Sequence, residues 1–131
     1  MLKILIVEDD RISQQILLKI LSDFGTCDLV NDGVEAIDAY LMAIEDNEPY
    51  DLISLDIMMP KIDGVKILGK IRGFEKKNKI KENKKAKIIM ISALAETDFI
   101  KLAFENGCDS YISKPINIAK MIENLKEMKL I

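Results

Sequence analysis

Apolar residues along this chain alternate between short continuous runs and longer stretches in which they recur at helical spacing. The continuous runs are typical of strands that are buried on both faces of a sheet, and the longer stretches are typical of amphipathic helices. Strands are predicted at 2–7, 27–30, 52–55, 87–91 and 109–113. Helices are predicted at 11–24, with a stop at Phe24-Gly25, at 34–44, 95–106 and 117–129, and in a segment that begins with Val65, Leu68 and Ile71.

The strict alternation of predicted strands and helices indicates the fold class. It favours a parallel sheet with helices on both faces, because right-handed crossovers place them there. Five units are too few for a closed eight-stranded barrel. We therefore expect an α/β protein with a flavodoxin-like (βα)5 doubly wound five-stranded parallel sheet in the strand order 2-1-3-4-5, and we expect residues 1–131 to form one domain.

Acidic residues stand at the ends of two predicted strands that this order makes neighbours. Asp56 ends the third strand and opens a loop with turn residues over 60–64, and Glu8, Asp9 and Asp10 follow the first strand. In open α/β sheets ligands bind at the carboxyl edge, where a carboxylate can act as a nucleophile or a metal ligand. The alternative for Asp56 is a loop residue that caps the next helix.

Two further polar residues point to phosphoryl chemistry at the same edge. Ser92 ends the fourth strand and Lys114 the fifth, roughly 10 Å from the third strand, which an extended lysine side chain can cover. Three carboxylates repel one another by about 4 kcal/mol per pair at ~4 Å and an effective dielectric constant of ~20, and a hard cation such as Mg²⁺ would relieve this. Asp56 could then attack a phosphoryl group whose oxygens are bound by Ser92 and Lys114.

Composition and charge exclude several other functions. With 49% hydrophobic and 31% charged residues the chain is typical of globular proteins, and no apolar run has membrane-spanning length. We expect a cytoplasmic protein with no membrane or nucleic-acid partner, since the net charge is −3 and no signal peptide precedes the first acids. Cys27 and Cys108 should lie at opposite sheet edges, too far apart for a disulfide. The absence of histidine excludes histidine-based catalysis, metal binding and phosphate carriage by this chain.

Four segments of the chain resemble the receiver domain of two-component response regulators: 4–10, 55–64, 91–93 and 111–115. The resemblance covers nearly the whole chain. It implies a phosphorylation switch that is not a turnover enzyme but assists its own phosphorylation and dephosphorylation. The phosphoryl group would come from a sensor histidine kinase or a histidine phosphotransfer protein, and its arrival would change the affinity for a protein partner.

The resemblance also implies a role for each site residue. Asp56 is then the phosphoacceptor. Mg²⁺, for which Mn²⁺ can substitute, would be held by Glu8, Asp9, Asp56 and the backbone carbonyl of Met58, with Asp9 as a direct ligand. The remaining implied roles are the switch hydroxyl of Ser92, the switch ring of Tyr111, which could also be a plain core aromatic residue, and the phosphate-pairing ammonium of Lys114, whose bond to Pro115 should be cis.

Partner binding is expected on the face formed by the fourth helix, fifth strand and fifth helix, which includes Lys101, Glu105 and Tyr111. No output domain is evident, so we expect output by protein contact, as a monomer or a phosphorylation-dependent dimer. The rival functions are a phosphatase with Asp56 as nucleophile, a receiver cut from a hybrid histidine kinase, and a degenerate unphosphorylated module. The phosphatase lacks an evident acid two residues after Asp56, where Met58 stands.

Two further expectations concern phosphoryl lifetime and the lysine-rich stretch. Met58 and Leu94, two residues after Asp56 and Ser92, are apolar and cannot orient an attacking water, so the phosphorylated form should be long-lived. The third helix should be weakened by Gly69 and Gly73. A long solvated connection, with partner docking as the alternative role, is expected from seven lysines: Lys76, Lys77, Lys79, Lys81, Lys84, Lys85 and Lys87.

Overall fold

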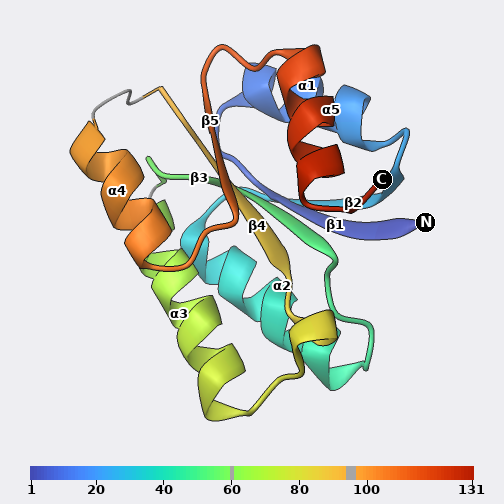
Figure 1. Cartoon of the computed structure of the whole chain (residues 1–131), viewed down its shortest axis with the longest axis vertical. Coiled ribbons are helices and arrows are strands. Elements are labelled where there is room, and N and C mark those ends of the chain that lie inside the picture. Colours follow the sequence, from blue (N-terminus) through green and yellow to red (C-terminus); the bar gives the residue numbers. More distant parts are fainter. Residues whose placement is uncertain (60, 94–96) are drawn as a thin grey trace.

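The computed structural model describes residues 1–59, 61–93 and 97–131 and shows a parallel sheet between two layers of helices (Figure 1). The strands are β1 (Leu2–Val7), β2 (Gly25–Val30), β3 (Leu52–Asp56), β4 (Lys87–Ser92) and β5 (Ser110–Ser113). The helices are α1 (Arg11–Leu21), α2 (Gly33–Glu45), α3 (Gly64–Lys77), α4 (Thr97–Glu105), α5 (Ile118–Glu127) and the short 3₁₀ helix η1 (Glu82–Lys84). The strand order β2-β1-β3-β4-β5 confirms the predicted fold.

Each face of the sheet has its own apolar core. Helices α1 and α5 cover one face, and α2, α3 and α4 cover the other (Figure 1). Successive strand residues point to opposite faces, so in β1 Ile4 and Ile6 pack towards α1 and α5 while Leu5 and Val7 pack towards α2 and α3. Burial on both faces explains why the strands appear in the sequence as continuous apolar runs.

The boundary between α1 and β2 differs from the prediction. The helix ends at Leu21, and Gly25, predicted to stop the helix, begins the strand. Gly25 pairs with Leu2, and a Cβ at this position would lie only 2.2 Å from the Leu2 carbonyl oxygen. Glycine is therefore required here by the close approach of two strands.

The third helix and the lysine-rich stretch also differ from the prediction. Helix α3 continues through Gly69 and Gly73 and includes Lys76 and Lys77, because its buried stripe extends from Ile67 as far as Glu75. The remaining connection contains η1, and Lys87 begins β4, as the predicted strand at 87–91 requires. The predicted start of the fourth helix at residue 95 lies outside the described residues. Strand β5 begins one residue later than predicted. Helix α5 begins one residue later and ends two residues earlier than predicted.

Side chains from the loops at the carboxyl edge cap the helices that follow. The N-terminal cap residues of α1, α2, α3 and α5 are Asp10, Asp32, Asp63 and Asn117, each of which accepts a hydrogen bond from the backbone N–H three residues later. These caps fix the direction in which each loop leaves its strand. Asp10 has this capping role.

A buried ion-pair network ties α3 to the opposite edge of the sheet. The Glu75 carboxylate is buried and accepts hydrogen bonds from Arg72 Nη1 at 2.7 Å and from the Ala86 N–H at 3.1 Å. Arg72 also donates to the carbonyl of Ala86 and the carboxylate of Asp109. One arginine thus joins α3, the start of β4 and the segment before β5.

Neither cysteine is in a disulfide: Cys27 lies on β2 and Cys108 just before β5. Across 1–59, 61–93 and 97–131, no helix has the length and apolarity needed to span a membrane.

Candidate functional site

The structure brings together the acids that the sequence places at neighbouring strand ends. Strands β1 and β3 pair in parallel up to Val7 and Leu55, so Glu8 and Asp56 are the next residues on adjacent strands. Carboxylate oxygens of Glu8, Asp9 and Asp56 all lie within 4.8 Å of one another. Glu8 and Asp56 are buried and Asp9 is exposed. The cluster is therefore open to solvent on the Asp9 side.

Lys114 reaches this cluster from β5, across β4. Its Nζ lies 2.7 Å from Glu8 Oε1 and donates a hydrogen bond of 3.2 Å to Asp56 Oδ2. Burial alone would lower the pKa of Lys114, but the carboxylates of Glu8 and Asp56 raise it above its ordinary value. The ammonium is thus held in its charged form between the two acids. The side chain also spans the distance from β5 to Asp56, as predicted.

Glu8 is the most perturbed acid of the site. Burial raises its pKa to about 7, with Asp56 adding to the rise and Lys114 opposing it. The Asp10 N–H lies 3.4 Å from Glu8 Oε2. Within the described residues, buried Glu8 Oε1 accepts no aligned hydrogen bond, although the Lys114 ammonium forms an ion pair with it. This oxygen therefore keeps a lone pair for a further cation.

The backbone after β3 is shaped around the Asp56 carboxylate. The Met58 N–H donates to Asp56 Oδ1 at 3.1 Å, and the Ile57 N–H continues the ladder to the Ile91 carbonyl. A Cβ at Gly64 would lie 2.2 Å from the carbonyl oxygen of Asp56, so only glycine lets α3 begin this close to the strand. The Met58 side chain is 59% exposed at the edge of the site.

Ser92 and Tyr111 lie on the neighbouring strands. Ser92 is the buried last residue of β4, one residue beyond the partner of Asp56, and its carbonyl accepts a hydrogen bond from the Lys114 N–H at 2.8 Å. Tyr111 is half-buried on β5. Burial raises the pKa of Tyr111, and a hydrogen bond with Ser92 acts in the opposite direction. The two switch candidates therefore contact each other.

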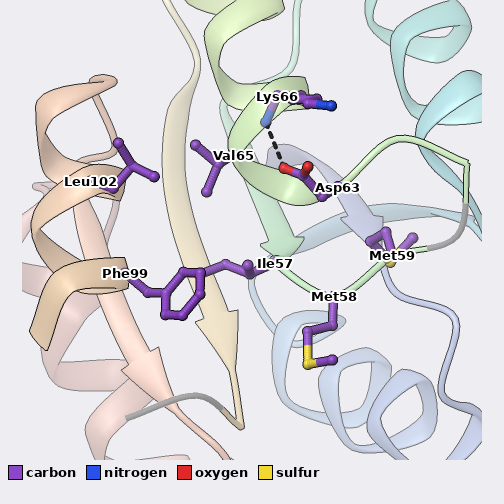
Figure 2. A pocket seen from close by; sticks show the side chains of 8 residues that line it. All are labelled: Ile57, Met58, Met59, Asp63, Val65, Lys66, Phe99 and Leu102. Carbon is purple, nitrogen blue, oxygen red and sulfur yellow. Dashed lines mark hydrogen bonds between the residues drawn. The ribbon is translucent and has the colours of Figure 1, made fainter. Parts of the chain in front are cut away.

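An apolar cleft of about 670 Å³ lies beside the carboxylates (Figure 2). Figure 2 shows Phe99 and Leu102 of α4 on one side, with Val65 of α3 and Ile57 and Met58 after β3 facing them. The other lining residues are Met59, Asp63 and Lys66. Met59 also packs against the core, as its apolar character suggests. Leu94, predicted to influence phosphoryl lifetime, lies outside the described residues.

Sequence reasoning missed a polar contact behind the acids. Gln14 Nε2 of α1 donates hydrogen bonds of 2.6 Å to the Glu8 carbonyl and 2.8 Å to Asn31 Oδ1. The pattern of the chain shows only a glutamine near the start of a helix. No spacing rule relates it to Asn31, because the contact exists only once β1 and β2 are paired.

The donor set fits a magnesium ion. All side-chain donors are carboxylate oxygens, the ligands that Mg²⁺ prefers, and they come from two rigid strand ends. The cluster of three acids faces one ammonium in the described structure, so it has excess negative charge and an oxygen without an aligned donor.

Comparisons with known proteins agree on one family. The family model of the response regulator receiver domain matches residues 4–126. The chain is 32% identical over 125 residues to the chemotaxis protein CheY of Treponema pallidum, with 94% of this chain and 79% of that protein covered. It spans only 7% to 52% of seven further curated relatives, which include response regulators and histidine kinases.

Two solved structures resemble the fold closely. One is a CheX-CheY-BeF3-Mg+2 complex from Borrelia burgdorferi, with a TM-score of 0.84 and 31% identity, covering 98% of this chain and 89% of that chain. The other is the complex of the Saccharomyces cerevisiae histidine phosphotransfer protein Ypd1 with the receiver domain of Ssk1. It has a TM-score of 0.82 and 28% identity, and covers 99% and 92% of the two chains.

Proposed function

The chain belongs to the response regulator receiver family of two-component signal transduction, and we propose that Asp56 is its phosphoacceptor. The observation that carries this proposal is the contact between the buried Asp56 carboxylate and Lys114, within a cluster that also holds Glu8 and Asp9. A loop aspartate with a capping role alone would need none of these partners, and the capping role for α3 belongs to Asp63.

The chemistry assigned to the chain is one in-line transfer. A carboxylate oxygen of Asp56 attacks the phosphorus of a phosphohistidine, the P–O bond forms as the P–N bond breaks, and the electron pair leaves to the imidazole nitrogen. Lys114 pairs with a phosphoryl oxygen once its contact with Asp56 Oδ2 is released. The hydroxyl of Ser92 binds a second oxygen. The donor supplies the histidine, which this chain lacks.

The residues that would hold Mg²⁺ are Glu8, Asp9, Asp56 and, through its backbone carbonyl, Met58. When bound, the ion neutralises negative charge on the transferring group. We propose that Mn²⁺ can substitute, because it accepts the same oxygen ligands. The relative from Borrelia burgdorferi, crystallised with Mg²⁺ and beryllofluoride, supports the assignment.

The donor is proposed to be a sensor histidine kinase or a histidine phosphotransfer protein, in line with the Ypd1 complex of a related receiver. Helix α1 starts three residues after Glu8 and exposes Ile12 (71%) and Ile16 beside the site. These two apolar side chains, one helical turn apart, suit a helix of the donor. We further propose that residues 1–131 form one receiver domain that acts in the cytoplasm.

The phosphorylated state is proposed to act through the face formed by α4, β5 and α5. This face exposes Lys101, Phe104 and Glu105 on α4 and carries the half-buried Tyr111 on β5. A phosphoryl group on Asp56 would draw Ser92 towards it and change the contact between Ser92 and Tyr111. The result is a population shift between two states, in a monomer or a phosphorylation-dependent dimer.

Phosphotransfer from a labelled histidine phosphotransfer protein tests the proposal. Wild-type protein should accept about one phosphoryl group per chain, Asp56→Asn should accept none, and Asp63→Asn, in the same loop, should behave like wild type. Continuous turnover of a generic phosphate ester would instead support the phosphatase. A receiver that accepts label but retains no partner in its beryllofluoride-treated form would contradict the switch.

A further inference from the structure

Gln14 connects the metal-binding acids to a loop outside the site. Its side-chain nitrogen donates to the Glu8 carbonyl at 2.6 Å and to Asn31 Oδ1 at 2.8 Å. A backbone carbonyl can only accept, so Gln14 must turn its NH₂ group to Glu8. Both contacts are short, and Gln14 is partly buried, so the side chain is confined to one orientation.

The Glu8 carbonyl belongs to the peptide unit that leads into Asp9. Because a peptide unit is planar, holding its oxygen restrains the peptide plane, in which the Asp9 N and Cα also lie, and so narrows the positions open to the Asp9 carboxylate. The Glu8 side chain is fixed separately, by Lys114 and the Asp10 N–H. Asp9 is exposed, and the structure gives its carboxylate no hydrogen bond or ion pair among the described residues. Its placement therefore depends on the backbone.

The turn that receives Gln14 is itself anchored on both sides. The Asn31 N–H donates to Glu35 Oε1 at 2.8 Å, and Lys61 Nζ in the loop after β3 lies 3.0 Å from Asp32 Oδ2. A Cβ on Gly33 would lie 2.7 Å from the Cβ of Ile62, so the turn presses against that same loop. The turn thus links the loop of Glu8 and Asp9 to the loop that follows Asp56.

We propose that Gln14 is a positioning residue for the phosphorylation site. It holds the Glu8–Asp9 peptide against the turn at 31–33 and so sets Asp9 to bind Mg²⁺, without touching the metal or the phosphoryl group. This inference rests on the proposed function and extends it to a residue beyond the acids. Supporting residues behind metal ligands commonly change metal affinity by about 10- to 100-fold when they are replaced.

The sharpest variant is Gln14→Glu, which keeps the shape of the side chain but removes both N–H donors. Its control is Gln15→Glu, which puts the same charge on the same helix at an exposed neighbouring position. A nearby negative charge alone would strengthen Mg²⁺ binding. We expect calorimetry to show about tenfold weaker Mg²⁺ binding for Gln14→Glu and no weakening for Gln15→Glu. Added negative charge would thus strengthen Mg²⁺ binding, whereas loss of the positioning contact would weaken it.

Gln14→Ala and the Mg²⁺ dependence of phosphorylation separate positioning from general stability. With a small acyl phosphate as donor, both Gln14 variants should need more Mg²⁺ for half-maximal rate yet approach the wild-type rate at saturating Mg²⁺. In NMR spectra, the Asp9 amide should shift in the Gln14 variants before metal is added.

The inference would be overturned if the Gln14 variants bound Mg²⁺ as tightly as Gln15→Glu does. It would also be overturned if the Gln14 variants differed from wild type only in a lower urea unfolding midpoint. If wild-type protein binds Mg²⁺ more tightly than the Gln14 variants but is never phosphorylated, the proposed function fails while the positioning role stands.

Discussion

Replacing Lys114 by methionine tests the electrostatics of the site most severely. The substitution keeps most of the apolar stem and removes the ammonium that lies 2.7 Å from Glu8 and 3.2 Å from Asp56. At an effective dielectric constant of ~20 these pairs are worth about 6 and about 5 kcal/mol before desolvation. Removing one partner of a buried pair typically costs about 3 to 5 kcal/mol net. With 19% of the Lys114 side chain exposed, we expect a loss of about 3 kcal/mol.

The loss should depend on pH in a defined direction. Lys114 lowers the pKa of Glu8, so without it the folded-state pKa rises further above about 7, while the ordinary value is 4.5. A carboxyl group whose pKa is raised by folding stabilises the protein most below its ordinary pKa, and this stabilisation is lost as pH rises through the folded-state pKa. The stability deficit of Lys114→Met should therefore be larger near pH 8 than near pH 5.

Urea unfolding with and without Mg²⁺ measures this deficit. Lys120→Met is the control, because Lys120 is exposed and has no ion pair in the described part of the chain. At pH 8 without Mg²⁺, Lys114→Met should unfold at a urea concentration lower by about 1 to 2 M. Mg²⁺ should restore stability to this variant more than to wild type. Equal midpoints for the two lysine variants at pH 8 would refute the reasoning.

Three further predictions separate structure, switching and phosphoryl lifetime. Arg72→Ala, which leaves buried Glu75 without its cation, should lower the free energy of unfolding by about 3 kcal/mol in urea while the phosphorylation rate at 25 °C stays unchanged; a slower rate would contradict the separation. Ser92→Ala should still be phosphorylated but should lose beryllofluoride-dependent partner retention in pull-downs, and normal retention would argue against a switch role. Met58→Asn, alone or with Leu94→Gln, should shorten the phosphoprotein half-life in excess Mg²⁺ by about ten- to a hundredfold, as followed by phosphate-affinity gel; an unchanged half-life would reject the water-exclusion argument.

Most of the fold and the main site could be predicted because both follow from local patterns. Apolar runs and helical spacing define the order of elements, and that order places the ends of β1 and β3 side by side. The reach of Lys114 to Asp56 followed from strand spacing alone. The cis bond between Lys114 and Pro115, implied by the family resemblance, is present in the structure.

What could not be predicted depends on contacts between distant segments. Glu75 stands beside Lys76 and Lys77 and looks like a solvated helix residue, yet it is buried because its partners are the Ala86 N–H and Arg72. The contact of Gln14 with Glu8 and the turn at 31–33 likewise requires the paired sheet. The solvated connection was wrong at Lys76 and Lys77, because tertiary packing extends α3 through Gly69 and Gly73 to Lys77.

The central claim is that Asp56 becomes phosphorylated, and intact-protein mass spectrometry tests it directly. Incubation with a small acyl phosphate and Mg²⁺ should add the mass of one phosphoryl group, which fragmentation should locate at Asp56. EDTA or Asp56→Asn should abolish the addition, and Asp63→Asn should not. An unchanged wild-type mass, or a phosphoryl group that persists in Asp56→Asn, would contradict the account.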